Sequence, residues 1–324
     1  MAGFNGKILA LSGGVGGAKL LHGLAEELPP EQLQAVVNTA DDFDFWDLRI
    51  CPDLDSNMYA LAALNDQDRG WGMEDETWRT MVAMRRLGGE TWFQMGDQDL
   101  ATHLYRSMEL RAGKSLTEVT AYMCQHLGVE HRLLPMCEEP VATEVLTDRG
   151  TMEFQEYFVR ERCQPSVQSL RFRGIEQASL NPAIADCLTD SELAAVVICP
   201  SNPFLSVDPI LSVPGFRQAL ADSGVPVVAV APIVAGNAVK GPLGKMMAEL
   251  DMPASASQVV RYYQQRHGDL IDAYLLDQQD SALADDIVQM GVAVAEADTM
   301  MTDMAAKRRV ATAVLELVEQ LSSR

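Results

Sequence analysis

A glycine-rich run near the N-terminus constrains the fold of this chain most strongly. An apolar stretch at Lys7–Leu11 leads into Ser-Gly-Gly-Val-Gly-Gly at Ser12–Gly17, and apolar residues then return with helical spacing. This order predicts a strand, a tight turn and a helix. Because a helix N-terminus offers unpaired N–H groups and the positive end of the helix dipole, the turn is expected to bind phosphate. Its candidate binding residues are Gly13, Gly14, Val15, Gly16, Gly17 and Lys19.

The spacing of these glycines fits neither of the two best-known phosphate-binding motifs. There is no Gly-Lys-Ser/Thr at the Walker position, and a strict dinucleotide fingerprint does not align with Gly13–Gly17. Two interpretations therefore stay open. The turn either holds a phosphorylated ligand or simply packs a helix tightly onto a strand.

Apolar, strand-like runs alternate with helix-like segments along the chain, which predicts an α/β fold. We expect a Rossmann-like, doubly wound and mainly parallel sheet within a single α/β domain spanning residues 1–324. The run Ala195–Cys199 is apolar throughout, as in a strand that helices cover on both faces. The expected strands are Lys7–Leu11, Gln34–Asn38, Ala194–Pro200, Pro226–Ala231, Ile271–Asp277 and Gly291–Ala295.

Three further segments interrupt or close this pattern. Residues from 56 to about 130 have helical periodicity and predict a helical insertion that covers the active site. Ala142–Leu146 and Met152–Phe158 alternate around a turn at Gly150, which predicts a β-hairpin. Met304–Leu321 is expected to form a final amphipathic helix.

Composition limits the possible partners and compartments. The net charge of −21 disfavours nucleic acid and anionic membranes, because such a surface repels phosphate polymers. No apolar run approaches the roughly 20 residues of a membrane span, and the N-terminus does not resemble a secretory signal. The six cysteines are scattered and form no zinc-binding pattern. We therefore expect a cytoplasmic protein.

Carboxylates gather after the second expected strand. Asn38–Asp42 and Asp53–Asp55 would lie beside the glycine turn, because strand ends of a parallel sheet meet at one edge. Mg²⁺ prefers such oxygen ligands and shares its shell with phosphates, so Asp42 and Asp55 are the preferred metal ligands. The alternative is a solvated acidic loop, although the aromatic residues within Phe43–Trp46 argue against it.

Three more loops carry polar groups that suit a ligand site. In the first, Asp97 and Asp99 precede Thr102 and His103; either carboxylate could cap a helix or act on an acceptor hydroxyl. The other two follow later strands and could contact a base and ribose, or be ordinary turns. Their candidate residues are Ser201, Asn202, Gly241 and Lys245.

Eight short motifs occur in a characteristic order along nearly the whole chain. They are Ser12–Leu20, Asn38–Asp42, Cys51–Asp55, Gly70–Gly72, Gly96–His103, Leu134–Met136, Pro200–Pro203 and Ala297–Met301. Together they resemble the 2-phospho-L-lactate transferase family of coenzyme F(420) biosynthesis.

The resemblance implies a specific reaction. A phospho-acid unit (2-phospho-L-lactate, or a phosphoenolpyruvate or 3-phosphoglycerate equivalent) would pass from a guanosine diphospho-acid to the terminal ribityl hydroxyl of the deazaflavin Fo, releasing GMP. It also implies dependence on Mg²⁺, a homodimer, a Rossmann-like core and a guanylyltransferase that makes the donor.

The resemblance also assigns residues to roles. Gly13–Gly17 would hold the diphosphate, Asp42 and Asp55 would bind Mg²⁺, and Asp55 or Asp97 would act at the Fo hydroxyl. The turns at Asn202 and Gly241–Lys245 would face guanosine. Further substrate-binding candidates within the shared motifs are Asn38, Asp53, Asp99, Thr102 and His103.

The chain departs from the family pattern in two places. Gln98 stands where a basic residue is usual, so a phosphate or acceptor contact is either absent or supplied by Arg106 or Arg111. Phe43–Trp46 differs from the loops of the family, which leaves the acid specificity open. The main rival hypothesis is a nonenzymatic regulator of the gluconeogenesis-factor type, which shares the glycine-rich loop and binds a sugar nucleotide. The Pro-Asp-Leu-Asp and Gly-Asp-Gln-Asp motifs favour the transferase.

Overall fold

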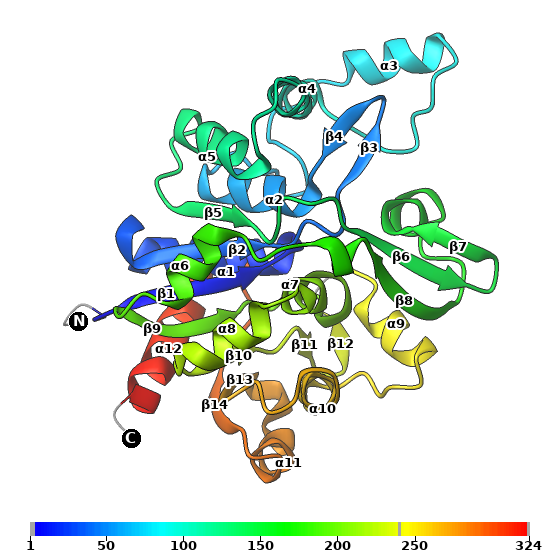
Figure 1. Cartoon of the computed structure of the whole chain (residues 1–324). Coiled ribbons are helices and arrows are strands. Elements are labelled where there is room, and N and C mark those ends of the chain that lie inside the picture. The colour runs from blue at the N-terminus through cyan, green and yellow to red at the C-terminus, as the bar shows by residue number, and fades with distance from the viewer. Residues whose placement is uncertain (1–3, 239–240, 323–324) are drawn as a thin grey trace.

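A seven-stranded parallel sheet forms the centre of the computed structural model, which describes residues 4–238 and 241–322 (Figure 1). The strand order is β14-β13-β10-β9-β1-β2-β5, and each neighbouring pair is parallel. The strands are β1 (Lys7–Ser12), β2 (Leu33–Val37), β5 (Arg132–Pro135), β9 (Leu193–Ile198), β10 (Val227–Val230), β13 (Ala273–Asp277) and β14 (Ala293–Ala297).

Helices cover both faces of this sheet. Because side chains alternate along a strand, Ile8 and Ala10 of β1 belong to one hydrophobic core and Leu9 and Leu11 to the other. The first core contains α1 (Gly14–Glu27), α2 (Pro52–Leu61), α5 (Leu116–His126) and α12 (Met304–Ser322). The second contains α6 (Pro182–Leu188), α7 (Asp208–Ser212), α8 (Phe216–Ser223), α9 (Leu243–Glu249), α10 (Ala256–His267) and α11 (Ala284–Gln289).

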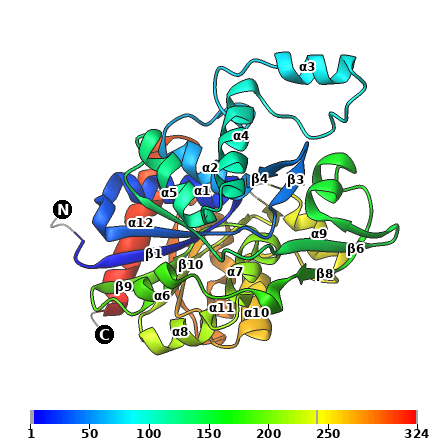
Figure 2. The same ribbon diagram turned by 45° about the horizontal axis from the view of Figure 1, so that its top comes forward.

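Smaller elements stand around the carboxyl edge of the sheet. One antiparallel sheet, in the order β7-β6-β8, lies at the right of the molecule in Figure 1. The β3–β4 hairpin lies below α3 and α4, which project from the body (Figure 2). These elements are β3 (Phe43–Phe45), β4 (Leu48–Ile50), α3 (Arg79–Arg86), α4 (Asp97–Arg111), β6 (Ala142–Thr147), β7 (Gly150–Glu153), β8 (Val167–Arg173), β11 (Ile233–Val234) and β12 (Asn237–Ala238).

Most of the sequence-based expectations for the fold are confirmed. All six expected strands form in one parallel sheet, and the hairpin and the final helix are present. The seventh strand, β5, was not expected, and β8 joins the hairpin as a third strand. The hairpin also ends earlier than expected, since the chain after Glu153 turns into a short helical segment at Glu156–Arg160.

Residues 56–130 divide into two parts. The helices α2 and α5 pack on the sheet, whereas α3 and α4 enclose a separate aromatic core with the β3–β4 hairpin. Phe43, Phe45 and Trp92 belong to this small core, so burial against one another accounts for the aromatic loop. No helix in the described part of the chain is long and apolar enough to span a bilayer.

Candidate active site

The turns that follow β1 and β9 meet at the point where the strand order reverses. In a doubly wound sheet this is the crevice in which ligands bind. Ser201 connects the two turns, since its Oγ accepts from the Gly13 N–H at 3.0 Å and donates to the Gly13 carbonyl at 2.8 Å. The glycine turn is therefore fixed before any ligand arrives.

Most glycines of this turn are explained by internal packing. A Cβ at Gly13, Gly16 or Gly17 would lie within 3.0 Å of the protein's own atoms, among them Pro200 O and Ser201 Oγ. The space beside these three is already filled by the protein's own atoms, so at these positions glycine serves the tight packing of the turn. Gly14 differs from these three. Its φ is +56°, a conformation that favours glycine, and a Cβ placed on it would lie 3.5 Å from the nearest side-chain atom, Oδ1 of Asp53.

Three carboxylates, Asp41, Asp42 and Asp53, form what we term the acidic pocket. All three side chains are buried, and among the described residues no basic side chain forms an ion pair with any of them. Burial raises the pKa of Asp42 to about 8 and that of Asp53 to about 6. Burial and the charges of Asp53 and Asp42 also raise the pKa of Asp41 well above its usual range.

Hydrogen bonds fix one side of this pocket. Asn38 Nδ2 donates to Asp53 Oδ2 at 2.9 Å, and Asn57 Nδ2 donates to the Asp53 carbonyl at 2.7 Å. By contrast, Oδ1 of Asp41 and Oδ1 of Asp42 are buried without a hydrogen-bond partner.

Buried carboxylates without an ion pair are costly, and the neighbouring donors, among them Asn38 and Cys51, stabilise the three carboxylates of the acidic pocket only in part. A hard divalent cation such as Mg²⁺ would relieve the remaining cost. Among the described residues, however, the carboxylates of Asp41, Asp42 and Asp53 are not close enough to one another to bind one ion together. An ion in the acidic pocket would be held by one or two of them and would complete its shell with water and phosphate oxygens.

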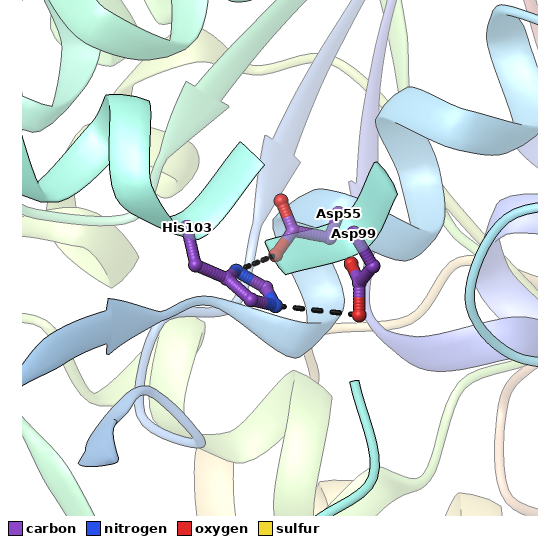
Figure 3. A group of neighbouring side chains, drawn as sticks. All are labelled: Asp55, Asp99 and His103. Atoms are coloured by element: carbon purple, nitrogen blue, oxygen red, sulfur yellow. Dashed lines mark ion pairs between the residues drawn. The ribbon is translucent and has the colours of Figure 1, made fainter. Parts of the chain in front are cut away.

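Asp55 lies in a different environment, which we term the Asp55 network: Asp55, Tyr59, Asp99, His103 and Arg106. Arg106 donates to both Asp55 oxygens, one at 3.1 Å, and only 2% of the Arg106 side chain is exposed. The His103 ring lies between the two carboxylates (Figure 3), with Nδ1 3.6 Å from Asp55 and Nε2 3.3 Å from Asp99. Tyr59 donates to the second Asp99 oxygen at 2.8 Å.

The charge balance of the Asp55 network argues against a metal ion inside it. Asp55, Asp99 and His103 are close enough to share an ion. However, the guanidinium of Arg106 already neutralises Asp55, and its Nη1 lies 3.4 Å from His103 Nδ1. Although burial opposes the shift, contacts from His103 and Tyr59 lower the pKa of Asp99. Asp42 lies close enough to Asp55 for their charges to interact, and the charge of Arg106 acts on both, but Arg106 forms its ion pair with Asp55 and not with Asp42.

Asp97 holds the start of α3. Its carboxylate accepts from Thr77 Oγ1 and from the backbone N–H groups of Arg79 and Thr80 at 3.1 and 3.0 Å. The hydrogen bond from Thr77 and those from the Thr80 backbone hold the Asp97 pKa well below its usual range. A carboxylate of such low basicity is a poor general base, so the geometry favours a structural role for Asp97.

The same region explains the unusual Gln98. Glu76 accepts from the N–H groups of Gln98 and Asp99 at 2.9 and 2.8 Å and so caps α4. The Gln98 side chain donates to the carbonyls of Glu74 and Asp75 at 3.2 and 3.3 Å. Gln98 therefore fastens the loop before α3 to α4, a task for which its amide suffices.

The remaining candidates are divided between the site and the scaffold. Asn202 Oδ1 accepts from two backbone N–H groups, while its Nδ2 is buried without a partner beside the turn after β9. Thr102 contacts the Tyr59 hydroxyl. Gly241 lies in an exposed turn. Lys245 donates to Glu249 at 2.6 Å and to the Pro165 carbonyl at 3.0 Å, so its ammonium already has scaffold partners.

The sequence interpretation names Arg106 only as an alternative, with Arg111, for the basic contact missing at Gln98, although the sequence held a signal for its role in an ion-pair network. Asp99, His103 and Arg106 are spaced at i, i+4 and i+7, which places them on one face of α4. Three ionisable residues on a face that also carries buried positions indicate an internal ion-pair network. The sequence did not indicate that Tyr59 belongs to this network, because a tyrosine in an apolar helix is normally predicted to be a hydrophobic core residue.

Comparisons with known proteins identify the family and the fold. The sequence model described as 2-phospho-L-lactate transferase CofD matches residues 8–314. A 2-phospho-L-lactate transferase of Methanosarcina mazei is 37% identical, over 95% of this chain and 99% of that protein. A phosphoenolpyruvate transferase of Streptomyces griseus is 36% identical, over 97% and 99%. A UPF0052-family structure from Bacillus halodurans superposes with a TM-score of 0.66 at 15% identity, covering 96% of this chain and 99% of that one.

Proposed function

Since this chain belongs to the 2-phospho-L-lactate transferase CofD family, we propose that it transfers a phospho-acid unit from a guanosine diphospho-acid to the deazaflavin Fo. The observation that carries the proposal is the position of the acidic pocket beside the fixed glycine turn, at the switch point of the sheet. A diphosphate at a helix N-terminus and a divalent cation held by carboxylates are the parts that phosphoryl transfer requires.

In the proposed reaction the terminal ribityl oxygen of Fo attacks the phosphorus that carries the acid. A new O–P bond forms, the bridging P–O bond of the diphosphate breaks, and GMP leaves with the bridging oxygen. The hydroxyl proton passes to solvent or to a carboxylate. Positioning and charge neutralisation account for most of the rate in such transfers.

We assign the metal to the acidic pocket. Asp42 remains a ligand, and Asp41 or Asp53 replaces Asp55 as its companion, because Arg106 already pairs with Asp55. When bound, Mg²⁺ would neutralise the charge that develops on the phosphate oxygens. The support for this assignment is that, among the described residues, no basic side chain forms an ion pair with Asp41, Asp42 or Asp53, whereas Asp55 has one.

We propose that Asp55 serves the acceptor instead of the metal. Arg106 fixes the orientation of the Asp55 carboxylate, which would accept a hydrogen bond from the acceptor hydroxyl when Fo binds. Asn202, with an unpartnered buried Nδ2, is the proposed contact for the guanosine side. Lys245 is left out of the proposed site, because its ammonium group is paired with Glu249.

The fold does not identify which acid is transferred, so the proposal names the chemistry that the candidate acids share. The relatives carry two names, 2-phospho-L-lactate transferase and phosphoenolpyruvate transferase, at nearly equal identity. We therefore propose the shared chemistry, a three-carbon acid joined through a phosphodiester. A homodimer and supply of the donor by a guanylyltransferase are part of the same proposal; light scattering of the purified protein tests the first.

The direct experiment supplies Fo, a guanosine diphospho-acid and Mg²⁺, and measures GMP release. We expect turnover by the wild-type protein and a loss of at least about a hundredfold in Asp53→Asn. Asp44→Asn is the matched control, because Asp44 lies on β3 with 63% of its side chain exposed. Absence of GMP with every donor acid would refute the proposal.

A further inference from the structure

A small hollow opens between α1, α2 and the start of α12, under the loop that follows α2. Its volume is about 80 Å³, and a single water needs roughly 10–15 Å³, so it has room for several waters or one small anion. Lys19 of α1 and Lys307 of α12 both line it. The whole chain has only six lysines, so two of them at one hollow make an unusual concentration of positive charge in an acidic protein.

Of the two lysines, Lys307 gives the stronger evidence for a bound anion. Only 5% of it is exposed, and in the described part of the chain no carboxylate forms an ion pair with it. Its Nζ lies 3.4 Å from His22 Nδ1, a neutral or cationic partner. Buried lysines are normally paired with an anion, because an isolated charge in the interior is costly.

The backbone holds Lys307 in this place. A Cβ at Gly23 of α1 would lie within 3.0 Å of the Lys307 carbonyl, so the two helices cross in close contact. Lys19 is directed to the same end of α12, since its Nζ donates to the Met301 carbonyl at 3.0 Å. Both ammonium groups are thus positioned by the fold before a ligand binds.

The loop over the hollow is also rigid. Asp66 N–H donates to the Gly72 carbonyl at 3.1 Å, and Glu74 N–H donates to the Leu64 carbonyl at 2.8 Å. This closed loop presents the side chain of Gln67 and the half-exposed ring of Trp71 to the hollow. Polar and cationic groups therefore face the same small space from three separate segments.

We propose that this hollow is a binding subsite for a phosphate group, with Lys307 and Lys19 as its cations. Two positioned ammonium groups at a space of this size suit a tetrahedral dianion, and charge-assisted hydrogen bonds supply the affinity. The subsite follows from the cavity and from buried Lys307, on which the charges of Asp303 and Glu26 act but which forms no ion pair with a carboxylate among the described residues. Only the identification of its phosphate with one belonging to the donor rests on the proposed function.

Two sources can supply the phosphate: the donor itself, or a separate phosphate-bearing anion that binds alongside it. The two sources differ in kinetics. If the donor fills the subsite, inorganic phosphate competes with the donor, and loss of Lys307 raises the donor KM. If a separate anion fills it, phosphate acts without competing with the donor, and the donor KM stays unchanged.

The first experiment titrates the full-length protein with inorganic phosphate by calorimetry, in a phosphate-free buffer and without Fo or donor. We expect saturable binding that weakens at least about tenfold in Lys307→Met and recovers in Lys307→Arg. Arg308→Met is the matched control: it removes a neighbouring cation of α12 that is 53% exposed and paired with Glu27. Its phosphate binding should match that of the wild-type protein.

A second pair of variants keeps the test valid if Lys307→Met fails to fold. Gln67 is exposed on the loop, so either charge can be placed there without disturbing the core. Gln67→Glu should weaken phosphate binding severalfold, and Gln67→Lys should strengthen it. The proposal is overturned if the wild-type protein does not bind phosphate at about 10 mM, or if folded Lys307→Met and Gln67→Glu bind it as the wild-type does. Because binding is measured without turnover, this result is independent of the transferase activity.

Discussion

Replacing Asp42 by asparagine should stabilise the metal-free protein, and the effect should grow with pH. The unfolded carboxyl titrates near its usual value of 3.8, whereas burial raises its pKa in the folded protein to about 8. Between these values the folded state binds more protons than the unfolded state, so the contribution of Asp42 to stability falls as pH rises from about 4 to 8. Asparagine has nearly the same shape and does not ionise.

The size of the effect follows from the shift. A change of about four pKa units corresponds to roughly 5 kcal/mol, and water penetration into the pocket reduces it, so we expect about 2–5 kcal/mol at pH 8 and about 1 kcal/mol at pH 5. Urea unfolding of metal-free protein at both pH values measures the difference. Asp44→Asn, an exposed substitution close by, should change stability by less than about 0.5 kcal/mol.

Magnesium should reverse the order of stability. An ion that binds only the folded state stabilises the wild-type protein in proportion to the logarithm of its concentration, and Asp42→Asn should lose most of that gain. If the stability difference between variant and wild type does not change between pH 5 and pH 8, Asp42 is compensated by a partner. The description of the acidic pocket would then be wrong.

Three further substitutions test the other parts of the site. Arg106→Met leaves Asp55 buried without its cation, so unfolding in urea should show a loss of about 3–5 kcal/mol; an unchanged midpoint would contradict the ion pair. The ionised Asp97 carboxylate stabilises the wild-type protein above about pH 4, and this stability is lost as the pH falls through the lowered pKa of Asp97. Asp97→Asn should lack that stability. The kcat of this variant should stay within about threefold, because loss of a general base costs about a hundredfold or more. Gly17→Ala should cost about 1–3 kcal/mol through overpacking, while Gly244→Ala, with open space around it, should not; equal melting temperatures would refute the packing argument.

The core of the fold was predictable because its strands are continuous apolar runs. β1 and β9 are buried on both faces, and that pattern is visible without a structure. β5 has only four residues and ends in Pro135, so neither its length nor its composition distinguishes it from a loop. The edge strand β8 contains two arginines, Arg171 and Arg173, and is stabilised by pairing with β6, which is information from another part of the chain.

The site was predictable in position but less so in chemistry. The carboxyl ends of parallel strands meet at one edge, so Gly13, Asp42 and Ser201 could be placed together from the sequence. The different partners of Asp42 and Asp55 could not be predicted, because the ion pair of Asp55 is made by Arg106, which comes from a helix more than fifty residues away along the chain. Spacing alone also hid the fact that neighbouring side chains fill the space beside most of the glycines.

The most direct test of the account is the mass of the deazaflavin after reaction. The protein would be incubated with Fo, GTP, Mg²⁺, a guanylyltransferase and each candidate three-carbon phospho-acid in turn, and the products resolved by mass spectrometry. We predict that, with at least one of these acids, Fo gains the mass of that acid joined through a phosphodiester, with one GMP released for each product molecule. Fo of unchanged mass with every acid, while the donor is shown to form, would contradict the assignment of this chain as a phospho-acid transferase acting on Fo.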